Sequence, residues 1–253
     1  MKLTFLGTGT SKGIPEIGCT CPTCLSTDQR DKRLRVSALI ETNEARILID
    51  CGPDFRMQML RIPFDRIDGV LLTHEHYDHT GGIDDLRPFA IFGDIDVYAD
   101  ELTHRHLRER LPYFFREVLY PGVPRLLFHT AQPYSSFTIK DTEVTPLLVM
   151  HGKLPILGYR IGNLGFVTDM TDAPEDTIAQ LQGIDTLVIG ALRQRPHATH
   201  QTIAEAIDIA HRVGARETYL IHMNHEAGLH AETEASLPEH IHLSYDGLTI
   251  EIK

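Results

Sequence analysis

The sequence lacks tryptophan and has only four cysteines, three of them within residues 19–24. Three clustered thiols do not close a disulfide framework, and this usage predicts metal binding in a reducing, cytoplasmic compartment. No apolar run approaches the roughly 20 residues that a membrane span needs. The N-terminal residues 1–13 also lack the apolar core of a signal peptide. We therefore expect no membrane partner.

Positive charge is scarce as well. Lys and Arg number 24 against 35 Asp and Glu, which gives a formal net charge of −11. Proteins that grip nucleic acid need a basic surface, so this balance argues against a nucleic-acid partner and favours a small molecule bound by local charge. No Pro-, Gly- or Ser-rich linker divides the chain, which predicts one domain over residues 1–253.

Short apolar runs that end in turns alternate with helical patterns. This arrangement predicts an α/β (α+β) fold in which two sheets are faced by helices. Strands are expected at 2–9, 36–42, 45–52, 69–76, 95–100, 125–129, 135–139, 142–151, 156–161, 164–168, 186–190, 217–222 and 248–252. Helices are expected at 54–62, 100–116, 174–182 and 199–213.

The segment THEHYDHTGG (73–82) carries the strongest chemical signal. His74, His76 and Asp78 alternate after an apolar run, so an extended segment would aim three nitrogen or oxygen donors in one direction. Asp78 and His79 are adjacent and cannot easily share one metal. The loop therefore predicts two metals.

Further polar residues follow apolar runs directly, namely His151, Asp169 and His222. Strand ends in α/β sheets converge on a common rim, where sites are built. We expect these side chains to join the histidine-rich loop.

The segment LRQRPHATHQ (192–201) offers groups for proton transfer and anion binding. A histidine suits a general acid near neutral pH, and His200 lies close to the start of a predicted helix. His197, Arg193 and Arg195 are weaker candidates for contacts with a substrate.

Cys19, Cys21 and Cys24 have a spacing that can wrap one zinc ion, which needs a fourth ligand. Cys51 and a histidine are the alternatives. His225 lies three residues after His222 and is the histidine that we consider.

The His-x-His-x-Asp-His run resembles the signature of the metallo-β-lactamase superfamily of binuclear hydrolases. The resemblance covers nearly the whole chain and implies a four-layer αββα sandwich. It implies that Asp169 bridges the two metals. It also implies that Asp50 supports residues 73–82, which we call the metal loop. The implied metal ligands are His74, His76, Asp78, His79, His151, Asp169 and His222.

The stretch GTGTSKGIPEIGCTCPTC (7–24) is similar to the opening of the phosphoribosyl 1,2-cyclic phosphate phosphodiesterases of the carbon–phosphorus lyase pathway. This resemblance implies that His225 completes a zinc knuckle and that His200 is the general acid. It further implies a structural zinc, two active-site metals (manganese or zinc, with iron as a further candidate) and a homodimer. Cys51 would then be a buried free thiol.

The function expected from these features is hydrolysis of a small phosphodiester, with a cyclic ribose ester as the first choice. A metal-bridging hydroxide would attack phosphorus, with His200 and Asp78 as catalytic residues. The alternatives are a nuclease similar to the tRNA 3′-processing enzymes and a non-hydrolytic protein similar to the pyrroloquinoline quinone biosynthesis member of the fold.

Overall fold

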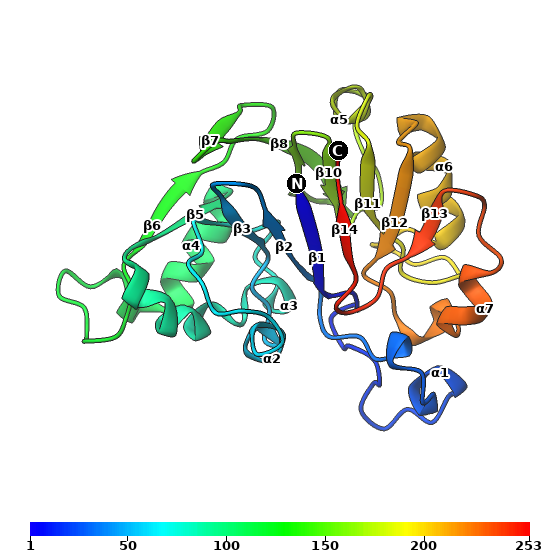
Figure 1. Ribbon diagram of the computed structural model, residues 1–253, viewed down its shortest axis with the longest axis horizontal. Coiled ribbons are helices and arrows are strands. Elements are labelled where there is room, and N and C mark those ends of the chain that lie inside the picture. Colours follow the sequence, from blue (N-terminus) through cyan, green and yellow to red (C-terminus); the bar gives the residue numbers. More distant parts are fainter.

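Two seven-stranded sheets form the centre of the computed structural model, which describes residues 1–253 (Figure 1). The first sheet contains, in spatial order, β14 (Thr249–Glu251), β1 (Lys2–Gly7), β2 (Ser37–Glu41), β3 (Arg46–Ile49), β4 (Gly69–Leu71), β5 (Ile95–Ala99) and β6 (Leu126–Thr130). The second contains β13 (Ile241–Leu243), β12 (Glu217–Ile221), β11 (Thr186–Gly190), β10 (Leu164–Val167), β9 (Leu154–Ile161), β8 (Thr142–His151) and β7 (Phe137–Ile139).

Each sheet is antiparallel on one side and parallel on the other. In the first sheet the change comes at β3, which pairs antiparallel with β2 and parallel with β4. In the second sheet it comes at β10, between β9 and β11. The central strands β3, β10 and β11 are buried along their whole length, as expected where helices and the other sheet cover both faces.

Helices cover the outer face of each sheet (Figure 1). Those beside the first sheet are α2 (Phe55–Met59), α3 (Tyr77–Thr80), α4 (Glu101–Arg110) and 3₁₀ helices at Ile83–Phe92 and Pro112–Phe115. Those beside the second are α5 (Glu175–Leu181), α6 (Ile203–Val213) and α7 (His230–Glu234). The N-terminal α1 (Pro22–Leu25) and 3₁₀ helices at Gln29–Asp31 and His225–Ala227 complete the set. No helix combines the length and apolar composition needed to cross a bilayer.

Three hydrophobic clusters separate the layers. The middle cluster holds side chains from both sheets, such as Ile47 and Phe166, and lies between them. A second packs the first sheet against its helices, and a third packs the second sheet against α5 and α6. This order of helix, sheet, sheet and helix confirms the predicted αββα sandwich.

The helix α6 begins later than the predicted range 199–213. Thr202 caps it: the Thr202 hydroxyl accepts from the N–H of Glu205, and the Glu205 carboxylate accepts from the N–H of Thr202. Gly214, at φ 71°, ends the helix in the left-handed conformation. His200 therefore lies in the loop before the helix.

Several expected elements differ in extent. The strand predicted at 69–76 ends at Leu71, because the metal-loop residues leave the sheet there. The helix predicted at 100–116 ends at Arg110, and Pro112 starts a 3₁₀ turn instead. The strand β13 was not predicted, since only three residues pair. His104 is buried, with its ring edge-on to that of Phe128.

The metal loop is packed backbone against backbone on the turn that follows β3. The N–H of Cys51 donates to the carbonyl of His79, and the N–H of Gly82 donates to the carbonyl of Cys51. A Cβ on Gly52 would lie 2.0 Å from the carbonyl oxygen of Asp78, and a Cβ on Gly82 would meet the carbonyl of Gly52 equally closely. Only glycine permits this approach.

Replacing Phe166 tests the packing between the sheets. Phe166→Ala removes a side chain with no exposed surface, so we expect a loss of about 3–5 kcal/mol in the free energy of unfolding, measured in urea. Val118→Ala is the control, because Val118 is 84% exposed and should change stability by less than about 0.5 kcal/mol. Similar values for the two variants would contradict the assignment of this core.

Replacing Gly52 tests the backbone contact. We expect Gly52→Ala to fold less stably and to lose metal, because its methyl group would push the carbonyl of Asp78 away. Gly162→Ala is a control for a glycine in open surroundings, although its positive φ adds some strain. Metal content by elemental analysis after dialysis is the measurement. Full metal content in Gly52→Ala would show that the loop can shift freely.

Candidate metal centre

Seven nitrogen and oxygen donors meet at one edge of the two sheets, in two neighbouring groups. In the first, the donor atoms of His74, His76 and His151 all lie within 4.8 Å of one another. Nε2 of His74 lies 2.9 Å from Nδ1 of His76. Two of these residues follow β4 and the third ends β8, so the group joins the first sheet to the second.

The second group is buried throughout and consists of Asp78, His79, Asp169 and His222. Oδ1 of Asp169 lies 3.2 Å from Nε2 of His222 and 3.4 Å from Nε2 of His79. Asp169 also lies close to His151 and His200. Asp169 therefore lies between the two groups.

Two of these donors, and Asp50 behind them, have an unusual backbone. Asp50, Asp169 and His222 have φ values of 57°, 52° and 61°. For residues other than glycine this conformation costs about 1–3 kcal/mol and is found mostly where function requires it. Each residue follows the end of a strand, and the turn brings its side chain back into the site. Sequence patterns did not indicate these conformations.

Asp50 holds the metal loop in place. Its carboxylate lies 2.7 Å from Nδ1 of His79 and accepts from both the N–H and the hydroxyl of Thr73. With Nδ1 occupied in this way, Nε2 of His79 is left for a metal. The structure thus places Asp50 behind the metal loop.

A backbone carbonyl orients a second ligand candidate. Nδ1 of His151 lies 2.7 Å from the carbonyl oxygen of Thr199, which fixes the ring and leaves Nε2 toward the site. Sequence reasoning missed Thr199, because a carbonyl contact leaves no trace in residue type.

The charges at the site are balanced between carboxylates and imidazoles. Burial alone would lower the pKa of His79, but Asp169, Asp78 and Asp50 raise it well above the ordinary value. Burial alone would raise the pKa of Asp169, but His222 and His79 lower it well below its ordinary range. The carboxylates therefore remain ionised at neutral pH and are available as ligands.

The unpaired nitrogens of this group fit divalent metals. Nε2 of His79 and both ring nitrogens of His222 are buried without a hydrogen-bond partner. Buried polar atoms are normally paired, so orphans beside ionised carboxylates call for a cation. Imidazole and carboxylate donors suit zinc, manganese and iron.

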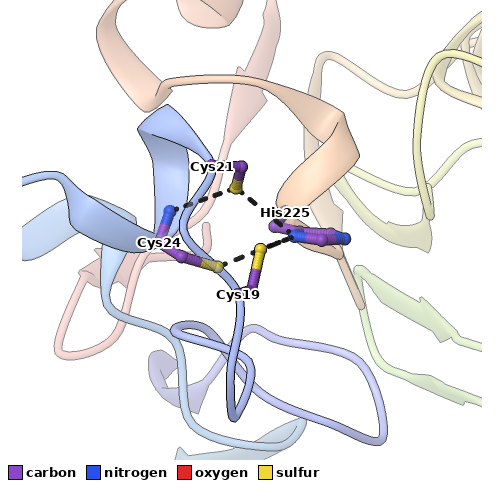
Figure 2. Close-up of side chains that lie close together, drawn as sticks. All are labelled: Cys19, Cys21, Cys24 and His225. Atoms are coloured by element: carbon purple, nitrogen blue, oxygen red, sulfur yellow. Dashed lines mark hydrogen bonds between the residues drawn. The ribbon is translucent and has the colours of Figure 1, made fainter.

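The three clustered cysteines converge on His225 (Figure 2). Their sulfur atoms lie 3.0 Å (Cys19), 3.4 Å (Cys21) and 3.6 Å (Cys24) from its Nδ1. Figure 1 shows α1, next to these cysteines, close to the C-terminal quarter of the chain. Three thiols and one imidazole are a frequent ligand set for structural zinc.

Cys51 does not reach this cluster. It is fully buried in the core between the first sheet and its helices, and burial raises the pKa of its thiol well above the ordinary value. Cys21, one of the cysteines near His225, differs from Cys51 in this respect. Burial alone would raise the pKa of Cys21, but the N–H of Cys24 and the neighbouring side chains lower it to about 7. Geometry thus favours His225 over Cys51 as the fourth partner.

His200 lies at the edge of the metal centre. Its Nδ1 is 3.9 Å from Asp169, and its ring stacks on His222 with 5.0 Å between centroids. His197 is exposed, with its ring 5.1 Å from that of His200. Burial and the neighbouring His222 lower the pKa of His200 to about 3.

A polar cavity of about 350 Å³ opens beside His200 toward the cysteine cluster. Lys12, Arg193, His197 and Glu226 contribute to its wall. Arg193 and Arg195 both form ion pairs with Glu226 there. Sequence reasoning singled out the two arginines and missed Glu226, although it directly follows His225.

Comparisons with known proteins agree with this geometry. Residues 45–223 match the family described as "Beta-lactamase superfamily domain". A protein of Porphyromonas gingivalis named octanoyltransferase is 49% identical over 250 residues, which is 98% of this chain but 51% of that protein. The chain spans about half or less of the length of the curated relatives that it matches.

Solved structures share the whole fold. The crystal structure described as a new diphosphatase from the PhnP family has a TM-score of 0.92 and 36% identity, covering 100% of this chain and 98% of its own. Zn²⁺-bound PqqB from Methylobacterium extorquens has a TM-score of 0.78 at 20% identity, with both chains fully covered, which shows the fold alone. This chain therefore belongs to the beta-lactamase superfamily, has the metallo-β-lactamase fold, and resembles the PhnP family within it.

Proposed function

We propose that this protein is a binuclear metal-dependent phosphodiesterase that hydrolyses a small phosphodiester, with a cyclic ribose ester as the first candidate. The observation that carries the proposal is the convergence of seven donors in two adjacent groups, with Asp169 between them and His200 beside it. The 36% identity with a diphosphatase supports phosphoryl chemistry at this site.

The side chains have distinct roles in this proposal. His74, His76 and His151 would hold one metal, and His79 and His222 the other, with Asp78 and Asp169 as the anionic ligands. Two bound divalent metals supply a nucleophile from water and neutralise charge on the phosphoryl oxygens. Asp50 keeps His79 oriented, and the carbonyl of Thr199 does the same for His151.

His200 would protonate the departing oxygen. In the protein alone its pKa is about 3, so it is neutral near pH 7. A phosphoryl anion held at the metals would lie near this ring, and a nearby negative charge raises the pKa of an imidazole. The proton-donor role thus depends on substrate binding.

A diphosphate is the second candidate substrate. The PhnP-family neighbour is described as a diphosphatase, and the same two-metal arrangement can serve a phosphoanhydride. The cavity beside His200 has room for a second group, but its cations already face carboxylates, Lys12 facing Glu16 and Arg193 facing Glu226. This pairing favours an uncharged group there over a second phosphate.

Other activities find less support. Octanoyl transfer belongs by name to a protein twice as long, and no cysteine nucleophile lies at this metal centre, since Cys51 is buried elsewhere. The solved structures of human tRNase Z and PqqB are 18% and 20% identical to this chain. A ribonuclease Z that is 40% identical matches only 33% of this chain. The net charge of −11 also argues against RNA. A homodimer, a cytoplasmic location, the catalytic role of Asp78 and the contact of His197 with a substrate stay predictions.

Metal removal tests the proposed activity. Protein stripped with a chelator should lose hydrolysis of bis-p-nitrophenyl phosphate, and manganese, zinc or iron should restore it. After reloading, a nucleoside 2′,3′-cyclic phosphate should turn over faster than a nucleoside diphosphate. Full activity of metal-free protein would refute the proposal, while a reversed substrate preference would favour the diphosphatase.

Replacing His225 tests the zinc knuckle. We expect His225→Ala to lose one zinc per chain and to lose activity, because His222 lies three residues away on the same strand end. Changes to residues that only contact a metal ligand already weaken metal binding by about 10–100-fold, so loss of a direct ligand should weaken zinc binding by at least as much. Cys51→Ala is the matched control and should keep full zinc. The opposite pattern would make Cys51 the ligand.

A further inference from the structure

The loop between β11 and α6 controls two groups of the metal centre at once. Its base is closed by the N–H of Leu192, which donates to the carbonyl of Gln201 at 2.9 Å. Its C-terminal end, next to this base, carries His200 and presents the carbonyl of Thr199 to His151 at 2.7 Å. The position of this loop therefore decides where the proposed acid lies and how His151 is turned.

Arg193 holds the loop in its bent shape. Its Nε donates to the carbonyl of Arg195 at 3.1 Å and one terminal nitrogen donates to the carbonyl of Pro196 at 2.9 Å. The other terminal nitrogen lies 2.5 Å from the carboxylate of Glu226. Each of the three guanidinium nitrogens thus makes one bond inside the protein, which uses three of its five N–H groups to hold the loop.

Glu226 joins this loop to the cysteine cluster. Its two carboxylate oxygens are divided between Arg193 and Arg195. Only 22% of the Arg193 side chain and 28% of the Glu226 side chain are exposed, whereas Arg195 is 74% exposed. Exposed ion pairs contribute little, so the contact with Arg193 dominates.

The backbone of Glu226 is itself held next to the knuckle. Glu226 directly follows His225 in a short 3₁₀ helix, and its N–H donates to the side chain of Asn224 at 2.8 Å. The N–H of Asn224 donates in turn to the carbonyl of Leu192 at 2.9 Å. Side-chain and backbone contacts therefore run from the cysteine cluster to the same loop.

We propose that Glu226 is a positioning residue, which uses Arg193 to hold the loop so that His200 can reach the leaving oxygen. This inference rests on the proposed general-acid role of His200. It makes the knuckle a support for catalysis as well as for folding. A surface ion pair without this role would affect stability alone.

The test compares leaving groups. p-Nitrophenolate departs without a proton, whereas a ribose alkoxide needs one, so a displaced general acid slows only the second reaction. In metal-loaded Glu226→Gln, we expect kcat for adenosine 2′,3′-cyclic phosphate to fall about tenfold or more, because general acids contribute about 10²–10⁴-fold. The rate on bis-p-nitrophenyl phosphate should fall much less, because the loop reaches that reaction only through the contact of Thr199 with His151. Glu226→Asp should recover part of the loss.

Controls separate the possible failures. Glu175→Gln breaks a surface ion pair with Arg212 on the far side of α6 and should leave both rates unchanged. His200→Ala should show the same leaving-group pattern as Glu226→Gln, with a larger drop. An equal loss on both substrates, or no loss, in Glu226→Gln would overturn the positioning role. If His200→Ala slowed both substrates equally, or neither, His200 would not be the general acid, and the inference about Glu226 would be wrong as well.

Discussion

The burial of the Asp50 carboxylate is the constraint on which the metal centre depends. Asp50 has no exposed surface, and an ionised carboxylate in such a place is costly unless it is fully hydrogen-bonded. Burial raises its pKa, while His79 and Thr73 supply the compensating contacts. The end of β3, the start of the metal loop and one metal-ligand candidate are thereby tied to a single charged group.

The metal centre also requires that the two sheets keep a fixed position relative to each other. His74 to His79 come from the first sheet, whereas the remaining donors come from the second. Two bonds cross between the sheets where the metal loop begins: the hydroxyl of Tyr159 donates to the carbonyl of Leu72 at 2.6 Å, and the N–H of Leu157 donates to the carbonyl of Thr73 at 2.9 Å. The dense core around Phe166 transmits any change of packing to the site, because close-packed interiors do not absorb strain locally.

Local patterns in the sequence were sufficient to find the donors. The residues of the metal loop are close in the chain, and His151, Asp169 and His222 each follow a recognisable apolar run. The features that the sequence could not predict depend on contacts between segments that are distant in the chain. The choice between Cys51 and His225 is an example, since it depends on how a loop near residue 20 meets residue 225. Neither Glu226 nor the Thr199 carbonyl could be predicted, because one is an ordinary charged residue and the other is backbone.

The strand end at β12 links the knuckle to the metal centre in both directions. His222 points to the active-site donors and His225 to the cysteines, and the N–H of Met223 between them donates to the carbonyl of Thr8 at 3.1 Å. If zinc at the cysteines fixes this segment, it lowers the cost of presenting His222 to a second metal. Coupling of this kind is reciprocal, so metals held by His222 must strengthen zinc binding at the cysteines by the same factor. The N-terminal loop is therefore part of the active-site architecture, although none of its cysteines belongs to the active-site donor groups.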